Sequence, residues 1–130
     1  MFKQVDYVMA MVSDMDRAVE FYRDKLGLPL KFQSPGWTEF NTGATTLALH
    51  GGGTPQQRPA TTEEGSQQAG TCWIGFSVAD LEKVYEELRA RGVVFSMPPT
   101  VRENEGINLA VCLDPDGLPV SFAELLQQQP

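Results

Sequence analysis

The segment VSDMDRAVEFY, residues 12–22, decides the fold, because it returns in altered form as VADLEKVYEEL at residues 78–88. Asp14 of the first copy and Asp80 of the second stand 66 positions apart, each directly before an apolar residue. Aspartate side chains accept hydrogen bonds from the free amides of a first helical turn. The repeat therefore predicts two helices that begin in the same way, with Ser13 as the alternative cap of the first.

The first helix is expected to lie in a module of one strand, one helix and three further strands. The run YVMAMV, residues 7–12, is short and mostly apolar, as in a buried strand. An apolar stripe at helical spacing then leads to a terminating glycine at position 27; it consists of Met15, Ala18, Val19, Tyr22 and Leu26. The runs LPLKFQ, WTEFNT and TTLALH, residues 28–33, 37–42 and 45–50, predict three strands separated by turn residues.

The second copy of the repeat is surrounded by the same elements in the same order. CWIGFSV (72–78) predicts a strand, and the helical stripe that follows is Leu81, Val84, Tyr85 and Leu88, with Gly92 at its end. VVFSM (93–97), INLAVCL (107–113) and LPVSFAEL (118–125) predict three strands, the last after the tight turn DPDG. The sequence thus predicts one α+β domain of two βαβββ modules, residues 1–50 and 71–130. Residues 51–70, whose only apolar members are alanines, are expected to form a linker or mobile flap.

The composition narrows the classes of function. A chain of 130 residues with 42% hydrophobic residues has the size and core of one globular domain. Its seventeen acidic and ten basic residues give a net charge of −7, which disfavours nucleic acid and anionic membranes as partners and favours cationic or neutral ones. No apolar run approaches the ~20 residues that span a bilayer, and the start of the chain lacks a signal-peptide pattern. We therefore expect a cytoplasmic protein.

The two cysteines, Cys72 and Cys112, both lie inside apolar, strand-like runs. They do not form a CxxC pair, the spacing of many metal and redox sites. We therefore predict two reduced, buried packing residues. Motifs of several enzyme classes are missing as well, because the sequence has no GxGxxG, no P-loop and no GxSxG elbow.

Three segments, SDMDRAVEFYRDKLGLPL, GFSVADLEKVYEELRARGV and DPDGLPVSFAEL, resemble the vicinal oxygen chelate superfamily, also called the glyoxalase, bleomycin-resistance and dioxygenase superfamily. The resemblance covers essentially the whole chain. It implies paired βαβββ modules whose curled sheets form an open cleft, often completed by a homodimer. The first and last segments are typical of the superfamily as a whole and of no single member.

In metal-using members, four cleft residues hold a divalent ion, from the first and the last strand of each module. Carried over by motif register, these positions are Tyr7, Ala48, Trp73 and Ser121. Metal-using members have His, Gln or Glu there, so the resemblance implies a metal-free branch without a cofactor.

Adding the histidine side chain of the chain does not complete this ligand set. His50 is the only histidine of the chain, and moving the last strands by two residues gives His50 in the first module but only Ala123 in the second. Glu124 is expected on the opposite strand face. The several imidazole and carboxylate ligands that a divalent ion requires are therefore not assembled.

The residues at the former metal positions predict a ligand-binding surface instead. Tyr7 and Trp73 are suited to stack on a flat ligand, or to fill the unused metal site as core aromatics. Met9 shares a strand face with Tyr7 and suits an irregular ligand or an ordinary core.

Further residues extend this surface. Trp37 and Glu39 share one face of WTEFNT, and Thr38 and Phe40 share the other; alternation alone leaves open which pair faces the cleft. His50, in phase with Ala48, is expected at the cleft mouth as a structural residue or an acid–base catalyst. Two residues of the second module, Arg102 and Asn108, are expected to form a polar rim or part of a solvated loop.

Three functions are compatible with these features. The first is a metal-free protein, similar to the bleomycin-resistance branch, that sequesters a planar aromatic or cationic small molecule. The second is a lyase, isomerase or dioxygenase with an atypical metal site, or with His50 acting without metal. The third is a fold used only for protein assembly or regulation. The first is the prediction, with a small-molecule ligand and a homodimer as the expected partners.

Overall fold

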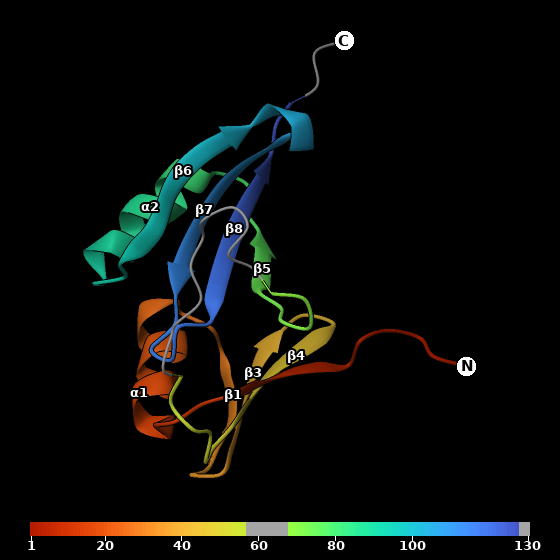
Figure 1. Ribbon diagram of the computed structural model, residues 1–130, viewed down its shortest axis with the longest axis vertical. Helices are drawn as coiled ribbons and strands as arrows, with labels where there is room; N and C mark the ends of the chain where they lie inside the picture. The colour runs from red at the N-terminus through yellow and green to blue at the C-terminus, as the bar shows by residue number, and fades with distance from the viewer. Residues whose placement is uncertain (57–67, 128–130) are drawn as a thin grey trace. The chain divides into compact units, whose positions relative to one another are not determined.

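Each half of the chain folds into one four-stranded sheet with a helix packed against it (Figure 1). The computed structural model describes residues 1–56 and 68–127, which fall into two units, Met1–Gln57 and Arg58–Pro130. The predicted α+β class and the two βαβββ modules are confirmed. Residues 57–67 of the predicted linker lie outside the described residues. Within the described ranges, no helix is long and apolar enough to cross a membrane.

The first unit begins with strand β1 (Tyr7–Met11), helix α1 (Met15–Val19) and its continuation η1 (Glu20–Lys25). Strands β2 (Leu30–Gln33), β3 (Trp37–Thr42) and β4 (Thr45–His50) follow. The strand order is β1-β4-β3-β2, with β1 parallel to β4 and the other pairs antiparallel. The core lies between one face of this sheet and the helix; its largest buried members are Tyr22, Phe40 and Leu49.

The second unit repeats this topology. It contains β5 (Ile74–Ser77), α2 (Leu81–Ala90), β6 (Phe95–Arg102), the short turn η2 (Glu103–Glu105), β7 (Ile107–Leu113) and β8 (Pro119–Leu125). The order β5-β8-β7-β6, again with one parallel pair at β5 and β8, matches that of the first unit strand for strand. The sequence repeat therefore encodes a repeated topology.

Both helices begin at the aspartates that the repeat predicts. Asp14 Oδ1 accepts a hydrogen bond from the amide of Arg17 at 3.1 Å, and Asp80 Oδ1 accepts one from Lys83 at 3.2 Å. Each cap satisfies an amide that has no partner within the helix. The alternative cap of the first helix, Ser13, does not fill this position.

The first helix widens into a π-helical turn in its second half. The amide of Leu26 donates to the carbonyl of Phe21, five residues back, at 2.9 Å. Phe21 and Tyr22 are both buried, with perpendicular rings 4.9 Å apart. The expected stripe, spaced for an ordinary α-helix, contains Tyr22 and misses Phe21, because the wider turn carries an additional residue into the core.

Strand β6 runs five residues beyond its predicted end at residue 97 and includes Pro98 and Pro99. Proline has no amide to donate and is therefore restricted to edge or irregular strands. β6 is an edge strand, and its pairing with β7 shifts register twice. The prolines thus mark an irregular edge, and the strand continues past them.

The prediction of two buried cysteines is wrong for Cys72, which is exposed. The strand predicted from residue 72 begins only at Ile74, so Cys72 precedes it. Cys112, on β7, is fully buried. Burial raises the pKa of the Cys112 thiol to about 12, with the negative charge of Asp114 acting in the same direction. This thiol is therefore neutral and unreactive near neutral pH.

Besides its cap at Asp80, the start of helix α2 is held by a carboxylate from the sheet. Glu124 Oε1, on β8, accepts a hydrogen bond from the amide of Leu81 at 2.7 Å. Ser121 and Ala123 face the other way by strand alternation, as the sequence predicts. Glu124 therefore has a structural partner at the helix start.

We expect Glu124→Ala to lower the free energy of unfolding by about 1–3 kcal/mol, because a partly buried amide loses its acceptor. Glu124→Gln keeps an oxygen acceptor and is expected to cost less. Denaturant titration of the three proteins measures both effects. An alanine variant as stable as the parent chain would show that this hydrogen bond does not stabilise the fold.

Candidate functional site

One face of the first sheet is not covered by the helix of its own unit, and strand pairing defines which residues lie on it. Met9 pairs with Ala48, Ala48 pairs with Glu39, and His50 pairs with both Met11 and Trp37. Residues paired in this way project from the same face. This surface, the open face, includes Tyr7, Met9, Met11, Trp37, Glu39, Ala48 and His50, with Thr46 and Asn41 paired beside Tyr7. Ala48 itself is fully buried.

The structure decides which pair of WTEFNT belongs to the open face. Thr38 and Phe40 are fully buried on the helix side, where the Thr38 hydroxyl contacts the Met15 sulfur. Trp37 and Glu39 therefore lie on the open face. Tyr7 remains 58% exposed there, so its ring is accessible within this unit.

Three rings are grouped on the open face at nearly right angles. The ring centroids of Tyr7 and Trp37 lie 6.3 Å apart with an interplanar angle of 72°. The centroids of Trp37 and His50 lie 6.1 Å apart at 88°. Edge-to-face contacts of this kind are favourable and leave ring faces available for other groups.

Trp37 is held at both its side chain and its backbone. The indole Nε1–H donates to Glu39 Oε2 at 2.9 Å. The hydroxyl of Ser34 donates to the Trp37 carbonyl at 2.7 Å, and the Ser34 Oγ in turn accepts a hydrogen bond from the Trp37 amide at 3.1 Å. A ring fixed in this way loses little conformational freedom when a ligand binds.

The imidazole of His50 has a defined orientation. Its Nδ1 lies 2.7 Å from the carbonyl oxygen of Gly51. A carbonyl only accepts hydrogen bonds, so we assign the proton to Nδ1, and Nε2 is left as an acceptor. Position 51 requires glycine, because a Cβ there would lie 2.5 Å from the Pro35 carbonyl oxygen.

A lysine that sequence reasoning did not single out completes the charge pattern. Lys31 Nζ lies 3.6 Å from Glu39 Oε1. Leu30 pairs with Phe40 of the helix side, so the next residue, Lys31, lies on the open face; the register shift that follows places Phe32 opposite Glu39 as well. The alternation of LPLKFQ cannot signal such a shift.

The other sequence-predicted site residues lie in the second unit. Ser121 pairs with Gly75 on the sheet face opposite to the stacked rings of Phe76 and Phe122. Trp73 is half-buried and precedes β5, outside the paired strand. Arg102 ends β6 and contacts Glu105 at 3.7 Å.

Asn108 is placed apart from Ser121 within that unit. It pairs with Glu124, whose carboxylate binds the start of α2, so it lies on the helix side of the sheet. Its Oδ1 is buried without a hydrogen-bond partner in the described part of the chain. The structure therefore brings together Tyr7, Met9, Trp37, Glu39, Ala48 and His50, and it does not place Asn108 on the face of Ser121.

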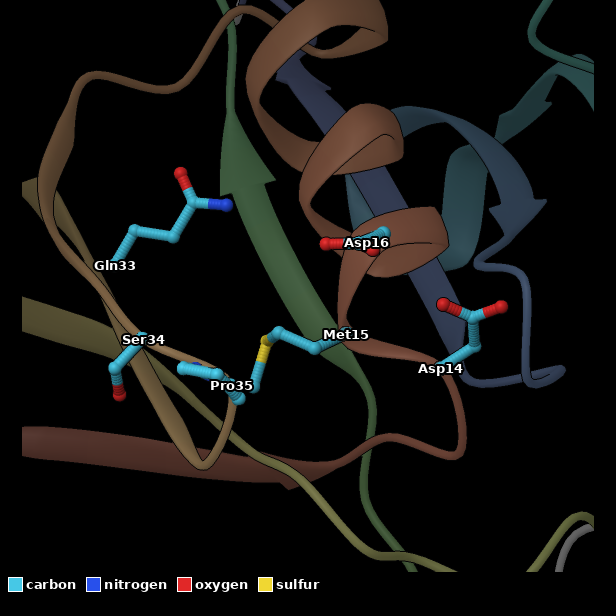
Figure 2. A pocket seen from close by; sticks show the side chains of 6 residues that line it. All are labelled: Asp14, Met15, Asp16, Gln33, Ser34 and Pro35. Carbon is cyan, nitrogen blue, oxygen red and sulfur yellow. The ribbon is translucent and has the colours of Figure 1, made fainter.

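Two surface hollows lie apart from the open-face residues. The first, about 440 Å³, is lined by Asp14, Met15, Asp16, Gln33, Ser34 and Pro35. Figure 2 shows Asp16 and Gln33 turned toward each other across it, while Met15 extends toward Pro35. The second, about 370 Å³, is lined by residues 101–105. The first hollow lies between the start of α1 and the end of β2, and none of the grouped rings lines it. Its Asp14 carboxylate already caps α1.

Comparison with known families agrees with this repeated topology. The model of the Glyoxalase/Bleomycin resistance protein/Dioxygenase superfamily matches residues 4–122. The chain belongs to this superfamily. Membership in the glyoxalase superfamily agrees with the two βαβββ modules.

Individual relatives are similar over most of the chain. "Uncharacterized protein YraH" of Bacillus subtilis (strain 168) is 29% identical over 114 residues, which are 84% of this chain and 88% of YraH. "Uncharacterized protein YurT" of the same organism is 33% identical over 99 residues, 68% of this chain and 75% of YurT. The crystal structure of a glyoxalase/bleomycin resistance protein/dioxygenase from Nocardioides has a TM-score of 0.75 at 25% identity, covering 99% of this chain and 87% of that one.

The residues at the four positions that the resemblance gives for a metal ion are poor donors for a divalent cation. In the first unit, Tyr7 offers a phenol and Ala48 no donor, and in the second unit the residues are Trp73 and Ser121. The described residues contain no group of three or more His, Cys, Asp or Glu side chains that could hold an ion. Divalent transition metals in proteins require several imidazole, thiolate or carboxylate ligands around one point.

Proposed function

We propose that this member of the glyoxalase superfamily is a metal-free binding protein for a planar small molecule that is aromatic or cationic. The observation that carries the proposal is the fixed Trp37 ring between those of Tyr7 and His50 on the open face. A flat ligand would replace water on these ring faces. Cation attraction to such a face contributes roughly 0.5–2 kcal/mol, which supports affinity without any reaction.

Calorimetric titration with 1-methylquinolinium chloride, a flat aromatic cation, tests the proposal. Saturable binding is expected, and mass spectrometry should then recover the probe unchanged. If neither calorimetry nor NMR detects binding at millimolar probe concentration, the proposal is contradicted.

We also expect the purified protein to contain far less than one zinc, nickel, iron or manganese per chain by elemental analysis. Chelators should leave the thermal midpoint unchanged, because no ion would add binding energy to the folded state. About one tightly held metal per chain, together with a chelator-sensitive midpoint, would overturn the metal-free proposal.

A second candidate, acid–base catalysis without metal, is favoured by the orientation of His50. Its Nδ1 is engaged by the Gly51 carbonyl, which leaves Nε2 as a base beside Trp37. Conversion of a bound compound, with turnover lost in His50→Ala, would favour this candidate over simple binding.

We further propose a cytoplasmic homodimer. Each sheet has an outer strand on both sides, β1 and β2 in the first unit and β5 and β6 in the second, and such edges favour being covered. Light scattering at micromolar concentration should give twice the chain mass of 14.3 kDa. A mass of one chain would contradict the dimer.

A further inference from the structure

The most informative charged group on the open face is the carboxylate of Glu39. Its side chain is 28% exposed, and both of its oxygens have partners. Oε2 accepts the indole N–H of Trp37 at 2.9 Å, and Oε1 faces the ammonium of Lys31 at 3.6 Å. A negative charge is thereby held directly beside the central ring of the grouped aromatics.

The two partners of Glu39 are bound unequally. The indole lies within ordinary hydrogen-bond distance, whereas 3.6 Å exceeds the roughly 2.7–2.9 Å of a charge-assisted hydrogen bond. The Lys31 side chain is 51% exposed, and exposed ion pairs contribute little because water screens them and the long side chain must be ordered. Lys31 therefore neutralises Glu39 but is easily displaced.

We propose that Glu39 is a subsite for the positively charged nitrogen of the ligand, and that Lys31 is a built-in competitor for this subsite. The inference rests on the proposed function, because the ligand's flat ring must lie against Trp37 and Tyr7. It narrows the ligand class to organic cations that join a flat ring to a charged nitrogen. On binding, the ligand cation replaces the Lys31 ammonium at Oε1, while the indole keeps Oε2 in place.

A matched pair of probes tests this assignment: 1-methylquinolinium, which is permanently charged, and quinoline, which has the same ring system and is mostly neutral near pH 7.5. Lys31→Met should tighten 1-methylquinolinium binding roughly two- to fivefold, because the competing ammonium is removed. Glu39→Gln keeps an acceptor for the indole but loses the charge, and should weaken 1-methylquinolinium about tenfold. Quinoline binding should change less than about twofold in both variants, which also shows that they fold.

Lys83→Met, on α2 of the second unit, is the matched control, because it makes the same change in net charge and keeps the Lys31–Glu39 pair. If Lys31→Met binds the cation no more tightly than Lys83→Met does, Lys31 is no competitor and the inference is overturned. If Glu39→Gln weakens both probes equally, Glu39 does not recognise charge, and the inference fails while the proposed ring site stands. If neither probe binds to the parent protein, the inference and the proposed function fail together.

Discussion

Phe40→Ala is expected to lower the free energy of unfolding by about 3–5 kcal/mol, the largest stability effect we predict. The Phe40 ring is fully buried on the helix side of the first sheet, with its centroid 6.0 Å from that of Tyr22. Removing it leaves a cavity that rigid strands close only partly. Denaturant titration of the whole chain measures the loss.

Phe32→Ala is the matched control for this prediction. Phe32 lies on the neighbouring strand β2 and is 52% exposed, so its loss should cost less than about 1 kcal/mol. Equal losses for the two variants would mean that the core does not lie between this sheet and its helix.

The second large effect concerns binding. Trp37→Ala should weaken 1-methylquinolinium binding by about 1–3 kcal/mol, because it removes both the central ring and the indole that holds Glu39. Trp37→Phe keeps a ring without the N–H and should lose less. Calorimetry measures both variants, with circular dichroism as the check on folding.

Trp73→Ala separates the contributions of the two tryptophans. Sequence reasoning places Trp73 at a former metal position and predicts that it also stacks on the ligand, and the same titration tests this. If Trp37→Ala leaves the affinity unchanged, the open face of the first unit is not the binding surface, whatever the result for Trp73.

The parts of the fold that depend on local chemistry were predictable from the sequence. Asp14 and Asp80 cap their helices because a carboxylate before an apolar stripe meets free amides wherever the helix lies. The order of helices and strands along the chain follows from the repeat, whereas the pairing order within each sheet was not predicted. The contents of the core were predicted less well, because the π-helical turn that buries Phe21 changes the period on which a stripe is recognised.

The candidate site was predictable only in part, for reasons of strand geometry. Alternation shows that Trp37 and Glu39 share a face, but which face packs on the helix depends on contacts with α1. Lys31 faces Glu39 because Leu30 pairs with Phe40, and the sequence does not signal this register of β2 against β3. Ser34 fixes Trp37 across a turn, which requires knowing how β2 and β3 pair.

The indole N–H resonances of the two tryptophans in a ¹H–¹⁵N correlation spectrum test the central claim most directly. Trp37→Phe assigns the signals, since it removes one of them. During titration with 1-methylquinolinium, we predict that the Trp37 signal shifts saturably with the dissociation constant found by calorimetry, because its N–H donates to Glu39 beside the bound cation. Binding by calorimetry with an unmoved Trp37 signal would contradict the account.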